Sequence, residues 1–162
     1  MHQQLESLFD EAESRYLKPE ELGVLSQYVD SLPQRLETYR LLRDKELDLM
    51  QQVADQLQTA MPQEKTETLE RSIKYALLML RYCAMAMLLN DNSFVQNRLL
   101  SWLTRTVQTY NTQTVDMALY RLLNQRLSQV LTPQQLSLLK PPLALAQSTL
   151  LSQAKAEAKT ET

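Results

Sequence analysis

The sequence predicts an all-α fold, and three observations lead to that prediction. Only one of the 162 residues is glycine, whereas the turns of sheet-rich folds need more. Leu, Gln, Ala, Glu and Arg, which are good helix formers, are abundant. Apolar residues recur at helical spacing, and no segment has convincing strand alternation. We expect about eight helices around a central apolar one, as in a globin-like bundle.

The first 60 residues are predicted to form three helices. The first covers residues 3–16, which have an apolar face. The second begins at Pro19, because proline is tolerated in a first turn where its missing N–H would be unpaired anyway. Ser31 and Gln34 flank Leu32-Pro33 in the pattern of a capping box. This pattern predicts that a separate third helix begins near residue 31 and continues to about residue 60.

The remaining sequence is predicted to form five helices. The second half of residues 67–89 is apolar nearly all round, which places this helix at the centre of the fold. Ser93 with Gln96, and Thr132 with Gln135, have the pattern of capping boxes that begin later helices. The predicted ranges are 67–89, 93–110, 114–131, a short helix from 132 to the stop at Pro141-Pro142, and 143–156.

Composition and charge exclude several functional classes. The net charge of −2, with acids and bases interspersed, leaves no basic stripe for nucleic acid. The apolar run at 76–89 is shorter than the roughly 20 residues that span a bilayer, so we expect no transmembrane segment. Residues 1–13 lack the basic start and apolar core of a signal peptide, and a single cysteine fits a reducing compartment. We therefore expect a cytoplasmic protein.

The residues needed for catalysis or metal binding are missing. His2 is the only histidine, so histidine-ligated haem and nucleophile–histidine catalysis are excluded. Cys83 alone cannot supply a cysteine-rich metal site, and Gly23 alone cannot form a glycine-rich phosphate loop. We therefore expect neither an enzyme nor a metal site. Cys83 is interpreted as a small buried apolar residue.

Three segments resemble the phycobiliproteins. Residues 80–98, LRYCAMAMLLNDNSFVQNR, are similar to the family pattern L-R-Y-x-x-Y-A-x-x-x-G-D-x-S-V-L-D-D-R without a gap. Arg15-Tyr16-Leu17, followed by Glu20-Glu21-Leu22, resembles the family's G-R-[FY]-L-x-x-x-E-[IL]. Met61-Pro62 ends a long helix as Phe-Pro does in phycocyanin subunits. The resemblance covers about residues 5–137. It implies one domain, 1–157, with a docking hairpin at 1–32, a globin core at 33–157 and a frayed tail at 158–162.

The resemblance also implies that the residues that bind bilin in the family are replaced in this chain. Counting back from Leu80 places Ser72 where the family has its bilin-bearing cysteine. Lys74 stands at the family's propionate-binding arginine, beside Arg71, and Tyr75 stands at its aspartate. Serine cannot form the thioether, and the loop before this site is short. We expect no covalent bilin and no cofactor. The alternative is a carrier that holds a bilin or another tetrapyrrole without a covalent bond.

In the resembled family, paired subunits exchange their hairpins, and the arginine of L-R-Y pairs with an acid on the partner's first helix. The corresponding residues here are Arg81 and Glu11. An arginine in an apolar helix is costly unless it is paired, which favours a partner carboxylate, although an intrachain pair or a solvent-facing Arg81 is the alternative. The apolar residues predicted to contact the partner are Leu5, Leu8, Phe9, Leu22, Leu25 and Tyr28.

These observations predict a pigment-free, phycobiliprotein-like binding protein of a cyanobacterium or related phototroph. We expect it to form a homodimer, or a heterodimer with a phycobiliprotein subunit, and to assist assembly, turnover or regulation of the antenna or a photosystem. Its complex would lie at the cytoplasmic face of the thylakoid. A non-covalent bilin carrier and a globin-like signalling module are the alternatives, and fold similarity alone does not decide among them.

Overall fold

The computed structural model describes residues 3–157, and all regular structure in this range is helical. The prediction of an all-α fold is therefore confirmed. The elements are α1 (Gln3–Ala12), α2 (Pro19–Ala60), α3 (Thr66–Leu89), α4 (Ser93–Val95), a π-helical turn η1 (Gln96–Leu100), α5 (Ser101–Tyr110), α6 (Gln113–Val130) and α7 (Pro133–Glu157). Because α4, η1 and α5 follow one another without a break, the described residues form six continuous helical segments rather than the eight predicted.

Three predicted helix ends are wrong, and two of them involve proline. The α1 helix ends at Ala12 rather than at residue 16. The α2 helix continues through Pro33, and α7 continues through Pro141 and Pro142. Ser31 does not cap a new helix, because its hydroxyl donates to the Tyr28 carbonyl within α2 at 2.8 Å. Each proline removes one backbone hydrogen bond, but packing along the rest of these long helices outweighs that loss.

The other two predicted capping boxes have different outcomes. The one at Thr132 is confirmed: Thr132 Oγ1 accepts from the Gln135 backbone N–H at 3.2 Å, and Gln135 Oε1 accepts from the Thr132 N–H at 3.0 Å. The one at Ser93 is wrong, because Asp91 Oδ1 instead accepts from the Ser93 backbone N–H and from its hydroxyl. A short acidic side chain directly before a helix performs the same capping role.

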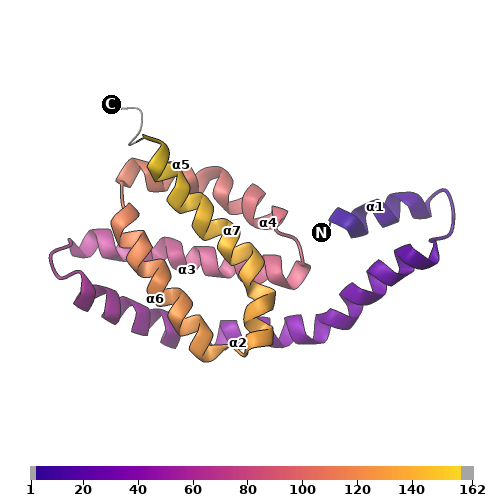
Figure 1. The fold of residues 1–162 in the computed structure, drawn as a ribbon, viewed down its shortest axis with the longest axis horizontal. Coiled ribbons are helices and arrows are strands. Elements are labelled where there is room, and N and C mark those ends of the chain that lie inside the picture. The colour runs from indigo at the N-terminus through magenta and orange to yellow at the C-terminus, as the bar shows by residue number, and fades with distance from the viewer. Residues whose placement is uncertain (1–2, 158–162) are drawn as a thin grey trace.

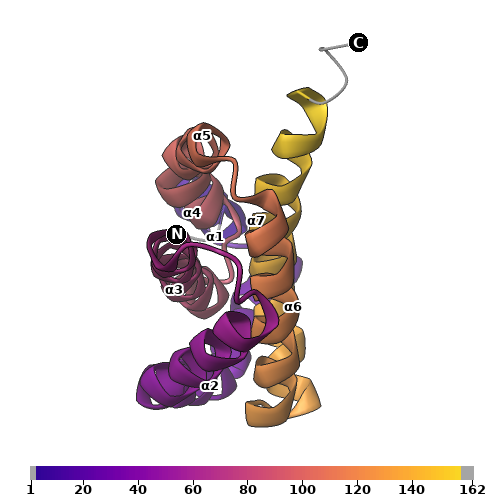
Figure 2. The same ribbon diagram turned by 90° about the vertical axis from the view of Figure 1, so that its left-hand side faces the viewer.

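The α3 helix lies at the centre of the molecule. It packs against α2, α6 and α7, and the segment from α4 to α5 turns at its C-terminal end and runs back alongside it (Figures 1 and 2). By length and composition α3 could cross a membrane, but nine of its residues are buried inside this fold. Its apolar surface is thus used as that of a core helix is, as predicted from its second half.

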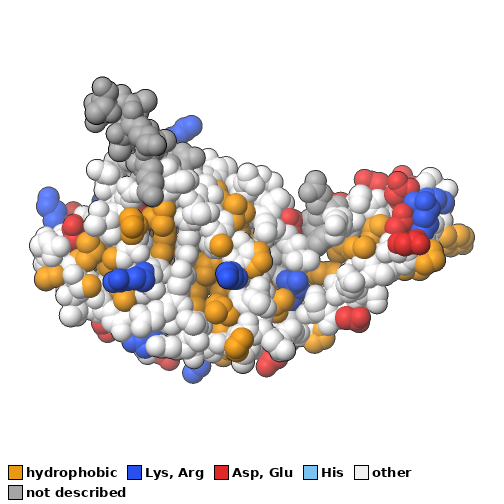
Figure 3. Space-filling view, in the orientation of Figure 1, with side chains coloured by type: hydrophobic (Ala, Val, Ile, Leu, Met, Phe, Trp, Pro, Cys, Tyr) orange, Lys and Arg blue, Asp and Glu red, His pale blue; other side chains and the backbone are white. Residues whose placement is uncertain are grey.

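The N-terminal hairpin consists of α1 and the first part of α2, and it projects from the core (Figure 1). The α1 helix folds back beside α2, so that its N-terminal end lies toward the core. The hydroxyl of Tyr28, on α2, donates to the Leu88 carbonyl at the end of α3 at 3.2 Å. This contact ties the base of the hairpin to the core, whereas the outer part of the hairpin stands free of it (Figure 3).

Candidate functional site

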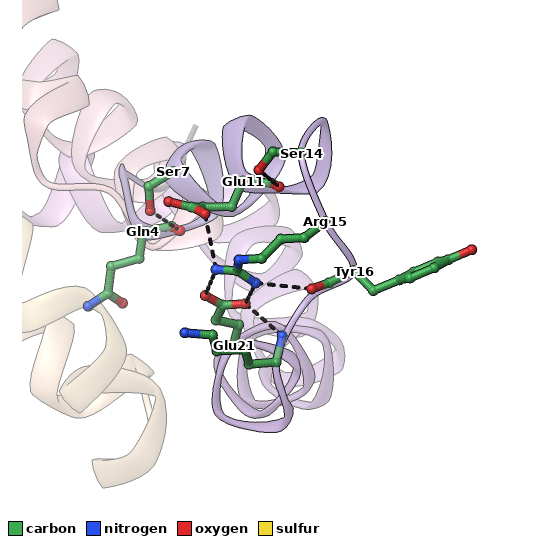
Figure 4. Close-up of polar contacts among 8 residues, drawn as sticks. Gln4, Ser7, Glu11, Ser14, Arg15, Tyr16 and Glu21 are labelled. Atoms are coloured by element: carbon green, nitrogen blue, oxygen red, sulfur yellow. Dashed lines mark hydrogen bonds and ion pairs between the residues drawn. The ribbon is translucent and has the colours of Figure 1, made fainter.

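An ion-pair cluster closes the turn of the hairpin (Figure 4). Arg15 forms two hydrogen bonds with the Glu21 carboxylate, at 3.0 and 2.8 Å, and an ion pair with Glu11 at 3.0 Å. The Arg15 guanidinium is the main cause that lowers the pKa of Glu21 to about 2, and a hydrogen bond from the Lys18 backbone N–H contributes. Both carboxylates therefore hold α1 against the start of α2, and Glu11 has an intrachain partner.

The apolar residues of the hairpin divide into an inner and an outer set. Leu5 is buried and contributes to the chain's own packing, so its contact with a partner stays a prediction that requires the hairpin to move. Leu8, Leu25 and Tyr28 are half-buried. Among the predicted contacts, Phe9 and Leu22 are the ones that lie exposed.

Three further exposed residues were missed by the sequence analysis. Val29 and Leu36 follow Leu22 at intervals of seven residues, which places all three along one side of α2. Tyr16 is 99% exposed and points away from the hairpin at its turn (Figure 4). The seven-residue spacing is present in the sequence. It was missed because the predicted helix end near residue 31 placed Leu22 and Val29 on one helix and Leu36 on the next. We call Leu22, Val29 and Leu36 the outer stripe.

Arg81 has an intrachain partner. Its Nε and Nη2 donate to the two carboxylate oxygens of Glu46, on α2, at 2.7 and 2.8 Å, and this pairing raises the pKa of Arg81. The Arg81 side chain is 59% exposed and already paired, so the argument that burial in apolar surroundings requires a partner subunit's carboxylate does not hold. The contact of Arg81 with a partner's Glu11 stays a prediction. The pair borders an open pocket of about 290 Å³ between α2 and α3, lined also by Tyr39, Leu42, Arg43, Leu80 and Ala84.

Ser72, the residue predicted to occupy the bilin-cysteine position, points into the core. Ser72 is 3% exposed, and its Oγ has no hydrogen-bond partner of good geometry among the described residues. The nearby Asp116, on α6, is also buried and accepts a hydrogen bond from the Thr112 hydroxyl at 2.7 Å. Burial raises the pKa of Asp116, and the hydroxyls of Thr112 and Ser72 oppose that shift. Ser72 thus faces a buried acid of the core.

The neighbouring residues of the bilin position are engaged with aromatic rings of α5. The Arg71 guanidinium lies 3.8 Å from the centre of the Tyr110 ring, a cation–π contact. Tyr75 packs edge-on against Trp102, with 6.5 Å between ring centres, whereas Lys74 is exposed. The sequence analysis missed Trp102 and Tyr110, because no local pattern links α5 with residues far earlier in the chain.

Cys83 is fully buried, and burial raises the pKa of its thiol to about 12. The interpretation of Cys83 as a buried apolar residue is confirmed, since a thiol with such a pKa is a poor nucleophile near neutral pH. In the part of the chain that the structure describes, no cluster of His, Cys, Asp and Glu could hold a metal ion. His2 lies outside the described residues.

Comparison with known proteins gives one family. No curated protein matches the chain. The family model of the phycobilisome protein matches residues 9–150, which include most of the hairpin and nearly all of the core. Members of this family assemble into oligomers with other subunits, carry pigment rather than catalyse reactions, and associate with the cytoplasmic side of the thylakoid. The family is globin-like, which agrees with the predicted bundle. From this match over most of its length, the chain belongs to the phycobilisome protein family.

Proposed function

We propose that this chain is a pigment-free member of its family that acts by binding protein. It pairs with a second copy of itself or with a phycobiliprotein subunit through the hairpin, and thereby assists assembly, turnover or regulation of the photosynthetic antenna or a photosystem. The observation that carries the proposal is the outer stripe, which runs along α2 from the hairpin that projects from the core (Figures 1 and 3) to the beginning of the core. Contiguous exposed apolar surface of this kind usually marks an interaction site.

The bilin position supports the pigment-free part of the proposal. Ser72 supplies no thiol and is buried, and Tyr75 supplies no carboxylate. Lys74, Arg71 and Tyr75 are the residues that would hold a non-covalent tetrapyrrole. Lys74 is exposed, but Arg71 and Tyr75 contact Tyr110 and Trp102. A ligand there would have to displace these contacts, so we favour the binding protein over the tetrapyrrole carrier.

The pocket beside Arg81 is the proposed receiving surface for the partner's hairpin. It combines apolar walls, from Leu42, Leu80 and Ala84, with the charges of Arg43, Glu46 and Arg81. The partner's hairpin offers both kinds of chemistry, since its α1 helix carries the exposed side chains of Glu11 and Phe9. Electrostatic matching of this kind favours one register of docking over others.

The outer stripe is tested by the substitution Val29→Glu, with Gln27→Glu as the control. Both residues are exposed on α2 and both substitutions add one negative charge, but Gln27 is not on the stripe. We expect Val29→Glu to weaken association at least about tenfold, because a charge must then be desolvated in the interface. Light-scattering mass across a dilution series measures this. Equal masses for the two variants at every concentration would overturn the proposed role of the stripe.

The pigment-free state is tested by an absorption spectrum of the protein expressed with and without a bilin-producing pathway. We expect no visible band in either preparation. A visible band that is lost on denaturation and extraction would instead establish a non-covalent tetrapyrrole carrier. A band that survives denaturation would establish covalent attachment, and either result would overturn the pigment-free proposal.

A further inference from the structure

A second pocket, of about 150 Å³, lies where the C-terminal end of α3 meets the middle of α7. Its polar lining comes from Arg35 on α2, Asn90 and Asn92 in the turn after α3, and Ser137 on α7. Pro141 and Pro142 form part of its wall. None of these residues lines the pocket beside Arg81, and none belongs to the bilin position. The volume is sufficient for several water molecules or one small ion.

Arg35 is a buried cation without a carboxylate partner among the described residues. The residue is 8% exposed, and burial is the main cause that lowers the pKa of its guanidinium. Its Nε donates to the Ser31 hydroxyl at 2.9 Å, and its Nη1 donates to the Met87 carbonyl. A guanidinium has five N–H donors, so these two bonds leave the other three. A buried charge in this state is costly unless a counter-charge joins it.

The amides of two asparagines add to the donors at this pocket. Asn90 ends α3 in the left-handed conformation, with φ of 50°, and Asn92 precedes α4 without making a side-chain cap. The carboxylate of Asp91, between them, accepts from Ser93 through Oδ1, at the start of α4. An anion that binds Arg35 can therefore also receive hydrogen bonds from Asn90 and Asn92.

The α7 wall of the pocket supplies acceptors rather than donors. Pro141 and Pro142 have no N–H, so the carbonyls of Ser137 and Leu138, four residues earlier, lose their helical hydrogen bonds. The hydroxyl of Ser137 donates to the Gln134 carbonyl at 2.6 Å. A ligand that binds both sides of the pocket must carry a negative charge next to Arg35. It must also carry an O–H group that donates a hydrogen bond to a carbonyl of α7.

We propose that this pocket binds a protonated oxyanion of the hydrogen phosphate class, held by Arg35, Asn90 and Asn92. The anionic oxygens accept from the guanidinium, which suits phosphate geometry, and from the two amides. The phosphate O–H donates to a carbonyl of α7. Sulfate can accept hydrogen bonds from Arg35, Asn90 and Asn92. It has no proton at neutral pH, so it cannot donate a hydrogen bond to a carbonyl of α7. This site does not depend on the proposed docking function.

The test is calorimetric titration of the full chain with inorganic phosphate and, separately, with sulfate, using two matched variants. Asn90→Asp places a negative charge at the pocket. Asn111→Asp makes the same change at the end of α5, where the residue is also an exposed asparagine in the left-handed conformation, with φ of 49°. Both substitutions therefore add one negative charge at a residue in the left-handed backbone conformation, but only Asn90 lines the pocket.

We expect saturable 1:1 phosphate binding that is tighter than sulfate binding. Asn90→Asp should weaken it at least about tenfold, because like charges a few ångströms apart repel strongly in a partly buried site. Asn111→Asp should leave it unchanged. No saturable phosphate binding, or equal loss in the two variants, would overturn the site. Equal affinity for phosphate and sulfate would overturn the role of the α7 carbonyls. Asn92→Asp provides an independent variant, since aspartate is as good as asparagine before a helix.

Discussion

Ser72 is predicted to stand where the resembled phycobiliproteins have their bilin-bearing cysteine, and its burial limits what a thiol at that position could do. The side chain is enclosed between α3 and the buried Asp116 of α6. A cysteine there would lack exposure, and burial near a carboxylate disfavours the thiolate. Restoring the sulfur atom alone therefore restores neither access nor nucleophilicity.

At the scale of this residue, we predict that Ser72→Cys does not load bilin covalently when the protein is expressed with a bilin-producing pathway. The same variant should react with a thiol reagent at least about tenfold more slowly than Lys74→Cys, because Lys74 is exposed two residues away. Wild-type Cys83 contributes little background, since it is buried with a pKa of about 12. Zinc fluorescence of the denatured band and the rate of thiol modification measure the two effects. A fluorescent band from Ser72→Cys would contradict this account of the site.

At the scale of the element, α2 contains a proline that does not interrupt it. The helix runs for 42 residues, and its first part belongs to the hairpin while its later part packs on α3 and α6. The two parts run in different directions (Figure 1). Pro33 lies within this helix, and its missing N–H leaves the Val29 carbonyl without its helical donor.

We predict that Pro33→Ala raises the free energy of unfolding by about 1–2 kcal/mol. The substitution restores one helical hydrogen bond and removes the ring clash, while the greater freedom of the unfolded chain offsets part of the gain. Pro33 is exposed, so no core packing is lost. Urea denaturation measures the change, and Gln27→Ala, also exposed on α2, controls for helix propensity alone. A lower stability for Pro33→Ala than for Gln27→Ala would mean that the fold requires the proline.

At the scale of the whole molecule, Arg81 and Glu11 each have an intrachain partner, and the proposed subunit contact requires an exchange. Glu46 holds Arg81 on the core, and Arg15 holds Glu11 on the hairpin. In each pair one side chain is more than half exposed, so solvent screening limits the cost of breaking it. If the partner's hairpin docks into the pocket beside Arg81, it removes water from that arginine. The loss of water favours an ion pair between Arg81 and a carboxylate of the partner's hairpin, which we propose is that of Glu11.

We predict that Glu11→Gln weakens association at least about tenfold, while Glu46→Gln leaves it unchanged or makes it tighter. The first substitution removes the proposed partner of Arg81, and the second removes its intrachain competitor. Arg81→Leu should weaken association as Glu11→Gln does. Glu13→Gln is the control, because Glu13 is exposed on the hairpin and the charge change is the same. Sedimentation across a dilution series gives the dissociation constants. Equal constants for Glu11→Gln and Glu13→Gln would exclude the Glu11–Arg81 contact.

Local patterns in the sequence correctly predicted the helical class, the central position of residues 67–89 and the capping box at Thr132. They failed where distant residues act together. The prolines at 33, 141 and 142 indicated helix ends, but long helices with extensive packing tolerate them. The partner of Arg81 could not be read either, since Glu46 lies 35 residues away on another helix.

The sequence by itself determined that this chain is all-α, and its local motifs predicted the family to which it belongs. These properties depend on residue type and local spacing, which a sequence contains in full. Only the tertiary structure decided which apolar residues of the hairpin face outward, that Ser72 is buried beside Asp116, and that Arg35 has no carboxylate partner among the described residues. Burial and pairing depend on which helices pack together, and that packing joins residues far apart in the chain.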